Sequence, residues 1–384
     1  MQKEMEINME ELGEQARKRA TSMTDEERVE FAKNLKVEDY REIPEYWKEH
    51  LEERIQKIHE RQIAVGSDGT SFGLVGDFHF TCNTLHAPAL LEKILEECAI
   101  PYFIQSGDIV SGMGVVTPEN LIREIVTVRK LFHRIESKML LTIGNHDPAY
   151  SLFPGEGYAQ SLTKEQLYEY MFRFQAQYPG RVFGPAGTYF YADDVCHKMR
   201  YVILNSHDTP TDELKEDGRP IYPKMWNTGM CQEQIDWFAH TALKVPDAEW
   251  TVVICTHEPY CLYGENHHHN RSLLLGIIDA FRKHTSFESA TDYPEKPGYS
   301  AKVSVDFTGA GGNFAAWVGG HYHQGVGEYE QGILCISPFS DGFRSVGNTE
   351  EQSFDIVTVD KKNHRLYLTQ VGFGMDREFD YEVY

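Results

Sequence analysis

Five short polar clusters combine aspartate, asparagine and histidine, and each follows a run of apolar residues. In Asp-x-His and His-x-His, two side chains point the same way from an extended segment, so both can reach one centre. These residues offer nitrogen and oxygen donors without thiolate, which suits metals such as Mn, Fe, Zn and Co. The clusters are Asp77-Phe78-His79, Gly107-Asp108, Gly144-Asn145-His146-Asp147, His257 and Gly320-His321-Tyr322-His323.

The number of donors in these clusters exceeds what one metal ion needs. Two metals about 3.5–4 Å apart can clamp the attacking and leaving oxygens of an in-line displacement and lower the pKa of a bound water. A single histidine is more often an ordinary hydrogen-bonded residue, but five clusters in this setting predict a dinuclear centre. Its candidate ligands are Asp77, His79, Asp108, Asn145, His257, His321 and His323.

The apolar runs before the first three clusters predict buried strands, separated by helices. We expect strands over 72–76, 102–105 and 139–143 and helices over 88–98 and 118–136. A βαβαβ order implies a parallel sheet covered by helices. Ligands of such sheets bind beyond the carboxyl ends of the strands, which is where the clusters stand.

The second half of the chain predicts further strands, with long loops around the helix expected near residue 271. We therefore expect two sheets with helices outside them. The expected helices cover 163–178, 232–243 and 271–284, and the expected strands cover 188–192, 200–205, 250–256, 315–318, 333–336, 354–359 and 366–371.

Residues 1–64 are rich in charge and contain helix signals, so we predict an N-terminal helical segment there and one domain over 65–384. An apolar stripe at helical spacing is formed by Trp47, Leu51, Ile55 and Ile58. We expect this stripe to pack on the main domain. The alternative is a face for self-association.

The composition narrows the class of protein. With 59 acidic and 37 basic residues the net charge is −22, which opposes broad binding to nucleic acid or to an anionic membrane. No apolar run reaches the ~18 residues of a membrane span, and the acidic start lacks the apolar core of a signal peptide. Seven cysteines without a C-x-x-C pair indicate a reduced chain. We expect a cytoplasmic protein.

The ordered set D-x-H, G-D, G-N-H-D, H and G-H-x-H resembles the calcineurin-like metallophosphoesterases over roughly residues 70–340. The resemblance implies an α/β fold, namely a four-layer αββα sandwich of two mixed sheets between helices. It also implies two divalent or trivalent metal ions, with Mn, Fe or Zn favoured.

Family resemblance further implies a role for each matched residue. One metal would be held by Asp77, His79 and His323, and the other by Asn145, His257 and His321, with Asp108 between them. His146 would contact the phosphoryl group and protonate the leaving oxygen. A metal-bound hydroxide would be the nucleophile.

Two departures from the family pattern locate the chain within it. Many members read G-D-x-x-D, where the second Asp orients the catalytic His; Ser111 stands there, so we predict that Asp147 supports the site instead. Asp147-Pro148-Ala149 replaces the Glu and nearby Arg of the protein serine/threonine phosphatases. The end of the chain, residues 371–381, is similar to bacterial and prophage members.

We therefore expect a metal-dependent phosphoric ester hydrolase acting on a small phosphorylated substrate, either a diester or a monoester. An assembly or binding protein with little activity on the same fold, as in phage or bacterial structures, is one alternative, and a nuclease is another. Weaker candidates for phosphate contacts are Arg271, Lys283 and Arg344.

Overall fold

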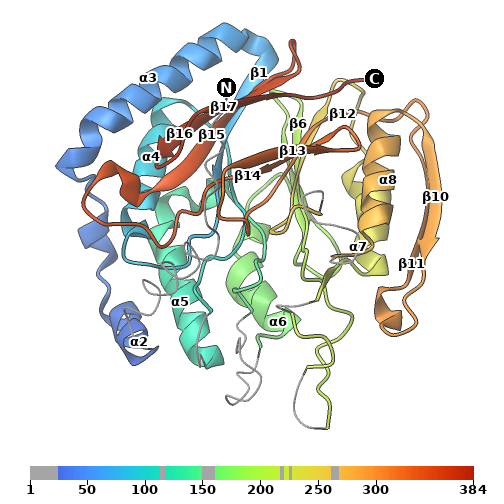
Figure 1. Ribbon diagram of the computed structural model, residues 1–384, viewed down its shortest axis with the longest axis horizontal. Coiled ribbons are helices and arrows are strands. Elements are labelled where there is room, and N and C mark those ends of the chain that lie inside the picture. Colours follow the sequence, from blue (N-terminus) through green and yellow to red (C-terminus); the bar gives the residue numbers. More distant parts are fainter. Residues whose placement is uncertain (1–24, 113–116, 149–160, 217–219, 225–226, 261–267) are drawn as a thin grey trace, which may run out of the picture.

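The computed structural model describes residues 25–112, 117–148, 161–216, 220–224, 227–260 and 268–384. Two large mixed sheets pack face to face, and helices cover the outer face of each sheet (Figure 1). The expected four-layer αββα sandwich is confirmed.

The first sheet has six strands in the order β17-β16-β15-β1-β2-β3. Three neighbouring strands, β1 to β3, run parallel, and the C-terminal strands β15, β16 and β17 continue the sheet with each strand antiparallel to the one before it. The strands are β1 (Gly69–Val75), β2 (Phe103–Gln105), β3 (Met139–Leu141), β15 (Ser353–Asp360), β16 (Arg365–Gly372) and β17 (Arg377–Asp380).

The second sheet has seven strands in the order β13-β14-β12-β8-β6-β5-β4. Its central strands β6, β8, β12 and β14 are parallel, and antiparallel strands close both edges. The strands are β4 (Arg181–Phe183), β5 (Phe190–Asp194), β6 (Met199–Ile203), β8 (Thr251–Cys255), β12 (Asn313–Val318), β13 (Val326–Glu330) and β14 (Ile333–Ser337).

The inner faces of the sheets form one apolar core, in which the rings of Phe72 and Tyr201 lie 5.3 Å apart. Helices α4 (Ala87–Glu97) and α5 (Pro118–Leu131) lie on the side of the first sheet, and α7 (Gln232–Trp237) and α8 (Arg271–Arg282) lie on the side of the second (Figure 1). Helix α5 begins where the sequence predicts, because the Thr117 hydroxyl accepts a hydrogen bond from Asn120 N.

The N-terminal segment packs on the first sheet. After α2 (Asp25–Asn34), α3 (Lys48–Val65) lies across β1, β15 and β16. The stripe of Trp47, Leu51, Ile55 and Ile58 is buried there, as expected, and is not presented to solvent. The division of the chain at residue 64 stays a prediction.

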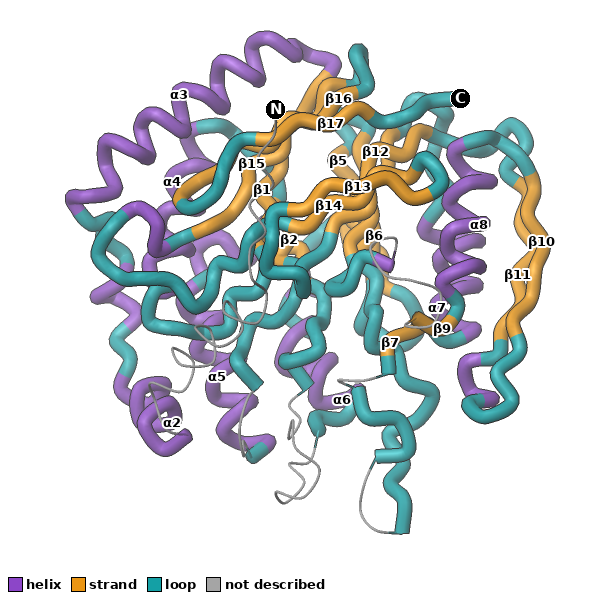
Figure 2. The backbone as a smooth tube through the Cα atoms, in the orientation of Figure 1, coloured by secondary structure: helices purple, strands orange, loops and turns teal. Residues whose placement is uncertain are grey.

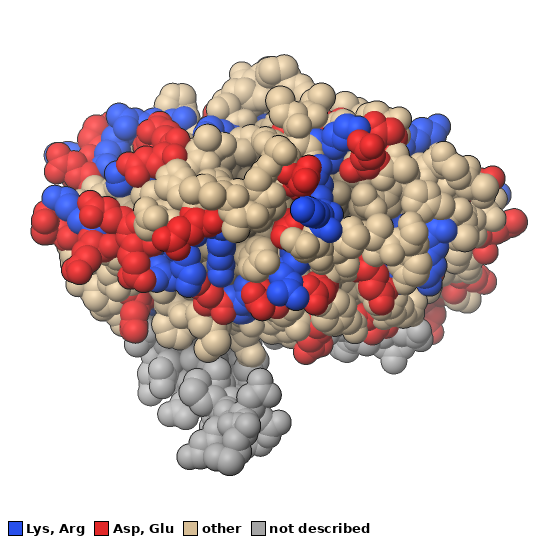
Figure 3. Space-filling model, turned by 90° about the horizontal axis from the view of Figure 1, so that it is seen from above, with Lys and Arg blue, Asp and Glu red and all other residues tan. Residues whose placement is uncertain are grey.

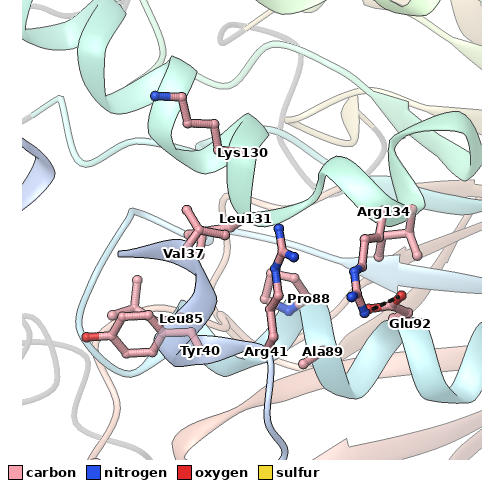
Figure 4. Close-up of a pocket in the computed structure, with 11 residues that line it drawn as sticks. Val37, Tyr40, Arg41, Leu85, Pro88, Ala89, Glu92, Lys130, Leu131 and Arg134 are labelled. Carbon is pink, nitrogen blue, oxygen red and sulfur yellow. Dashed lines mark hydrogen bonds and ion pairs between the residues drawn. The ribbon is translucent and has the colours of Figure 1, made fainter. Parts of the chain in front are cut away.

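A small hollow marks the junction between the N-terminal segment and the helices of the first sheet. It lies between the 3₁₀ turn η1 (Val37–Tyr40) and helices α4 and α5 (Figure 4). Arg134 reaches Glu92 across it at 3.3 Å. None of the residues that line it belongs to the five polar clusters.

The structure differs from expectation in several places. The expected helix over 163–178 is short, α6 (Lys164–Leu167), and continues as a π-helical turn. A hairpin of β10 (Ser286–Thr291) and β11 (Ala301–Asp306) lies outside α8, where long loops were expected (Figure 2). Two further short strands, β7 (Thr228–Gly229) and β9 (His268–His269), pair with each other.

Two predictions drawn from composition have different outcomes. Cys335 is disulfide-bonded, so the expectation of a wholly reduced chain is wrong at this residue. Within the described ranges, no helix has the length and apolar character needed to cross a bilayer.

Candidate metal centre

The five polar clusters meet at one end of the sandwich, where strands of both sheets end. The first sheet contributes the loops that follow β1, β2 and β3, and the second contributes those that follow β8 and β12. Three groups of possible ligand atoms lie within 4.8 Å of one another: Asp77 with His79 and His323, His79 with Asp108 and His146, and Asp108 with His257 and His321.

Asp77, His79 and His323 form one side of the cluster. Asp77 Oδ1 lies 3.3 Å from His323 Nε2, which lies 3.2 Å from His79 Nε2. Burial opposes ionisation of Asp77, but His323 outweighs it and lowers the pKa of this carboxyl to about 2. Burial lowers the pKa of His79 to about 3, so this imidazole is neutral, as a metal ligand must be.

Asn145, His257 and His321 form the other side. Asn145 Oδ1 lies 2.9 Å from His257 Nε2 and 2.9 Å from His321 Nδ1. Burial holds the pKa of His321 well below its usual value. This side therefore gathers one amide oxygen and two ring nitrogens around a single point.

Asp108 stands between the two sides. Its Oδ2 lies 3.2 Å from His257 Nε2, 3.8 Å from His146 Nε2 and 3.9 Å from His79 Nε2. This oxygen is buried and has no hydrogen-bond partner among the described residues. Asp108 therefore lies next to candidate ligands from both sides of the cluster.

The protonation of His257 tests whether this arrangement fits a cation. His257 Nδ1 lies 2.7 Å from the carbonyl oxygen of Ser106, so Nδ1 carries a proton and donates it. In the neutral ring, Nε2 then presents a lone pair to Asp108 Oδ2 and Asn145 Oδ1, which are both acceptors. Only a cation or a second proton can satisfy three such atoms, so the residues fit a bound metal.

In the absence of metal, a proton takes that place. Burial opposes the charge on His257, but Asp108 outweighs it and raises the pKa of His257 to about 10. Against the effect of its own burial, His257 and His146 hold the pKa of Asp108 well below its usual range. Metal and proton therefore compete for the same position, and metal binding releases a proton.

The backbone of the ligand loops adopts an unusual conformation. Five ligand residues have left-handed φ angles, which non-glycine residues rarely adopt; they are Asp77 (52°), His79 (52°), Asp108 (52°), His321 (67°) and His323 (58°). Hydrogen bonds between the loops hold them there, such as His79 N to Asp108 O at 2.8 Å. Gly144 is required beside them, because a Cβ atom would clash with Asp108 Oδ1.

Asp147 supports this backbone. Its carboxylate accepts hydrogen bonds from four main-chain N–H groups: Gly144 at 2.7 Å, Asp108 at 2.9 Å, Ile109 at 2.7 Å and Val110 at 3.3 Å. Burial, followed by the neighbouring Asp108 charge, raises the pKa of Asp147 to about 7. Its carboxylate thus ties the loop after β2 to the loop after β3.

His146 is held by a group that the sequence did not reveal. Its Nδ1 lies 2.6 Å from the main-chain oxygen of Ser111, which fixes the proton on Nδ1 and turns Nε2 toward Asp108. Among the described atoms, Asp147 makes no hydrogen bond to the His146 ring. The main-chain carbonyl of Ser111 thus holds the His146 ring, and any residue type supplies a carbonyl.

The weaker candidates for phosphate contacts are engaged elsewhere or lie at the edge of the site. Arg271 donates to Tyr260 O at 2.7 Å and to Glu330 Oε1 at 2.9 Å, and Lys283 pairs with Asp279. Arg344 donates to Ser340 O at 2.7 Å. The segment around Arg344, residues 340–344, lies against the Asp77 loop, although no sequence motif marked it.

Comparison with known proteins gives a family and a set of similar folds. A family model for calcineurin-like phosphoesterases matches residues 70–325. No curated protein sequence matches the chain. A dimetal phosphatase from Danio rerio is 15% identical, covers 82% of this chain and 99% of its own, and has a TM-score of 0.48.

Two further solved structures are less similar. The phosphopantetheinyl hydrolase of Mycobacterium tuberculosis is 13% identical over 72% of this chain and 91% of its own, with a TM-score of 0.31. A putative 5′-nucleotidase of Staphylococcus aureus is 13% identical over 82% of this chain and 54% of its own, with a TM-score of 0.35. Because the family match spans most of the chain and includes the ligand loops up to His323, this protein belongs to the calcineurin-like phosphoesterase family and is a metal-dependent phosphoester hydrolase.

Proposed function

We propose that the protein hydrolyses phosphodiesters in preference to phosphomonoesters. One observation carries the preference: the charges that act most strongly on the described ligands belong to His, Asp and Glu side chains, with no Lys or Arg among them. A monoester dianion would bring an extra negative charge, whereas Arg271 and Lys283 are already paired with Glu330 and Asp279. A diester carries a single negative charge, because a second ester group replaces one of the charged oxygens.

The seven ligands would hold two metal ions, with Asp108 between them. When bound, the metals would lower the pKa of a water molecule and neutralise charge on the phosphoryl group. The roles of the individual ligands follow the family pattern and stay predictions.

His146 is the proposed general acid. Ser111 O holds its Nδ1–H, so Nε2 is the atom that carries and releases the second proton. The imidazole is partly exposed, with 15% of its side chain accessible, so a bound ester can reach it. Asp147 is a positioning residue in this proposal, because its hydrogen bonds fix the main chain of Asp108 and Gly144.

The net charge also favours a small substrate over a nucleic acid. Figure 3 shows acidic and basic side chains intermingled on the face viewed from above, without a continuous basic area. With a net charge of −22, a long polyanion would meet overall repulsion.

The test compares bis-p-nitrophenyl phosphate with p-nitrophenyl phosphate as substrates. The protein is stripped of metal and reloaded with Mn, Fe, Zn or Mg, and Asn145→Ala and His146→Ala serve as controls. We expect metal-dependent turnover that favours the diester and is lost in both variants. Faster turnover of monoesters than of every diester tested would contradict the proposal.

A further inference from the structure

The segment Ser340 to Arg344 is built against the first ligand loop. Asp341 N donates to Gly76 O at 3.0 Å, and Gly342 N donates to Asp77 O at 2.8 Å. Phe343 N donates to the Thr81 hydroxyl at 3.3 Å. These bonds place the segment beside Asp77 and His79 without making any of its residues a metal ligand.

Gly342 allows this close approach. A Cβ atom at this position would lie 2.9 Å from Asp77 O, 3.0 Å from Phe78 O and 3.2 Å from His79 Cβ. No larger residue fits there without moving the ligand loop. The position of the following residue is therefore fixed relative to the metal ligands.

That following residue, Phe343, has a left-handed backbone with φ of 63°. This conformation is rare for a bulky residue and strains the backbone. Glycine would adopt this conformation without strain. The chain instead has phenylalanine at this position and bears the strain. Strain of this kind concentrates at ligand-binding positions.

The Phe343 ring lies over the imidazoles of the metal site. Its centroid is 4.7 Å from the His79 ring and 6.3 Å from the His323 ring. Phe343 is partly exposed, and the His323 side chain is 36% exposed, whereas His79 is buried. The phenyl ring therefore stands at the solvent-facing rim of the cluster.

The position of His146 relates this rim to the substrate. The His146 ring is 4.9 Å from the His79 ring, about as far as Phe343 is. Both rings adjoin the His79 ring, so an ester group on a phosphoryl group that contacts His146 can extend toward Phe343. An aromatic side chain can stack on planar rings of different chemical types.

We propose that Phe343 determines substrate specificity by stacking on the planar aromatic ester group that remains on the phosphorus when the leaving group departs, either an aryl group or a nucleoside. This inference rests on the proposed diesterase activity. Phe343 has no role in the reaction itself. It selects which esters bind productively.

The experiment keeps the leaving group constant and changes the ester group that remains. Methyl, phenyl and thymidine 5′-esters of p-nitrophenyl phosphate are compared in metal-loaded wild type, Phe343→Leu and Phe343→Tyr. Phe373→Leu is the matched control, because Phe373 packs on Phe339 and Arg344 in the same region without an interaction with the ligand rings in the described structure. Metal content is measured for every protein.

We expect Phe343→Leu to lose about ten- to hundredfold in kcat/KM on the phenyl and thymidine esters, mainly through KM, and little on the methyl ester. Phe343→Tyr should retain the wild-type values, and Phe373→Leu should resemble wild type. A loss confined to the thymidine ester would identify a nucleoside as the group that is recognised. Equal losses on all three esters, loss of metal, or no change would overturn the proposal.

A binding measurement separates this inference from the proposed activity. Calorimetry of thymidine 5′-monophosphate and methyl phosphate, with wild type and Phe343→Leu, requires no turnover. If wild type hydrolyses no diester, the diesterase proposal fails, and a selective loss of thymidine 5′-monophosphate binding in Phe343→Leu still supports stacking. Equal affinity of wild type and Phe343→Leu for thymidine 5′-monophosphate would refute the stacking proposal.

Discussion

Two buried carboxylates, Asp108 in the metal centre and Glu351 beneath the N-terminal segment, have opposite surroundings. Glu351 Oε1 accepts hydrogen bonds from the Tyr46 hydroxyl and Trp47 Nε1, both at 2.8 Å, and Oε2 accepts one from Gly347 N at 2.8 Å. Asp108 Oδ2 has no described donor and faces three imidazole nitrogens.

The difference separates a structural carboxylate from a functional one. Burial of an ionised carboxylate is costly unless hydrogen bonds or a cation compensate it. The protein itself completes the surroundings of Glu351, whereas those of Asp108 are complete only with a proton on His257 or a metal. A buried acid with unmatched acceptors is thus a structural sign of a missing cation.

The largest effect should come from removing the charge of Asp108. We expect Asp108→Asn to lower metal-dependent kcat by at least about 10²–10³-fold, the magnitude seen when one group that stabilises transition-state charge is lost. Turnover and bound metal are measured together, with Glu351→Gln as the control that changes the other carboxylate. Wild-type activity in Asp108→Asn would show that the Asp108 carboxylate has no role in turnover and would contradict its distinction from Glu351.

Asp341 sharpens the comparison, because the surroundings of this buried acid are intermediate between those of Asp108 and those of Glu351. Its Oδ1 accepts from Ser353 N at 2.8 Å and its Oδ2 has no described partner. Burial raises the pKa of Asp341 to about 7. Between about pH 4 and 7 the folded protein thus holds a proton that the unfolded chain releases, so the stability from this group falls as pH rises.

Asp341→Asn should remove this pH dependence. We expect the free energy of unfolding of the metal-free variant to decline less than that of wild type between pH 4.5 and 7.5, by the order of 3 kcal/mol. Urea unfolding of both proteins at several pH values measures the difference. Parallel curves for the two proteins would show that Asp341 does not titrate in this range.

Metal loading should stabilise the protein through the Asp108 centre. At a free metal concentration a hundred times Kd, a single site contributes about 2.7 kcal/mol. We expect Mn²⁺ or Zn²⁺ to raise the unfolding midpoint of wild type, and to raise it less in Asp108→Asn. Chelator-treated protein is the reference. An equal rise in both proteins would place the bound metal elsewhere.

The smallest effect should follow from Glu351→Gln. The amide keeps one acceptor oxygen, but an NH2 group replaces the other. A donor that faces Glu351, Trp47 Nε1 or Gly347 N, therefore loses its partner, at a cost of about 1–2 kcal/mol. Activity per folded molecule should not change. Urea unfolding measures the loss, with the exposed neighbour in Glu350→Gln as control. Loss of activity without loss of stability would link this carboxylate to the metal centre.

The sequence predicted the sandwich and the ligand clusters because both depend on local patterns. Apolar runs mark β1, β2, β3 and β8, and the polar residues that follow them are adjacent in the chain. The hairpin β10–β11 was missed because its first strand, Ser286–Thr291, is largely polar and exposed in alternation. Strand propensity is weak where a strand has one partner and little buried surface.

Contacts made by the main chain were beyond prediction from residue types. The carbonyl of Ser111 holds His146, and the N–H groups of four residues hold Asp147. Neither contact depends on the side chain of the residue that supplies it. For the same reason, no motif marked the segment around Gly342 and Phe343, which the fold brings to Asp77 from more than 200 residues away.

The pairing of β1 with β15 has a consequence for synthesis of the chain on the ribosome. Gly69 pairs with Asp360, about 290 residues later, while β2 and β3 follow β1 closely. The first sheet can begin from β1, β2 and β3 while translation continues, but one edge of β1 has no partner until β15 emerges. Contacts of such long range slow folding, and an unpaired strand edge promotes aggregation. The nascent protein should therefore depend on chaperones from the time that β1, β2 and β3 form until β15 emerges.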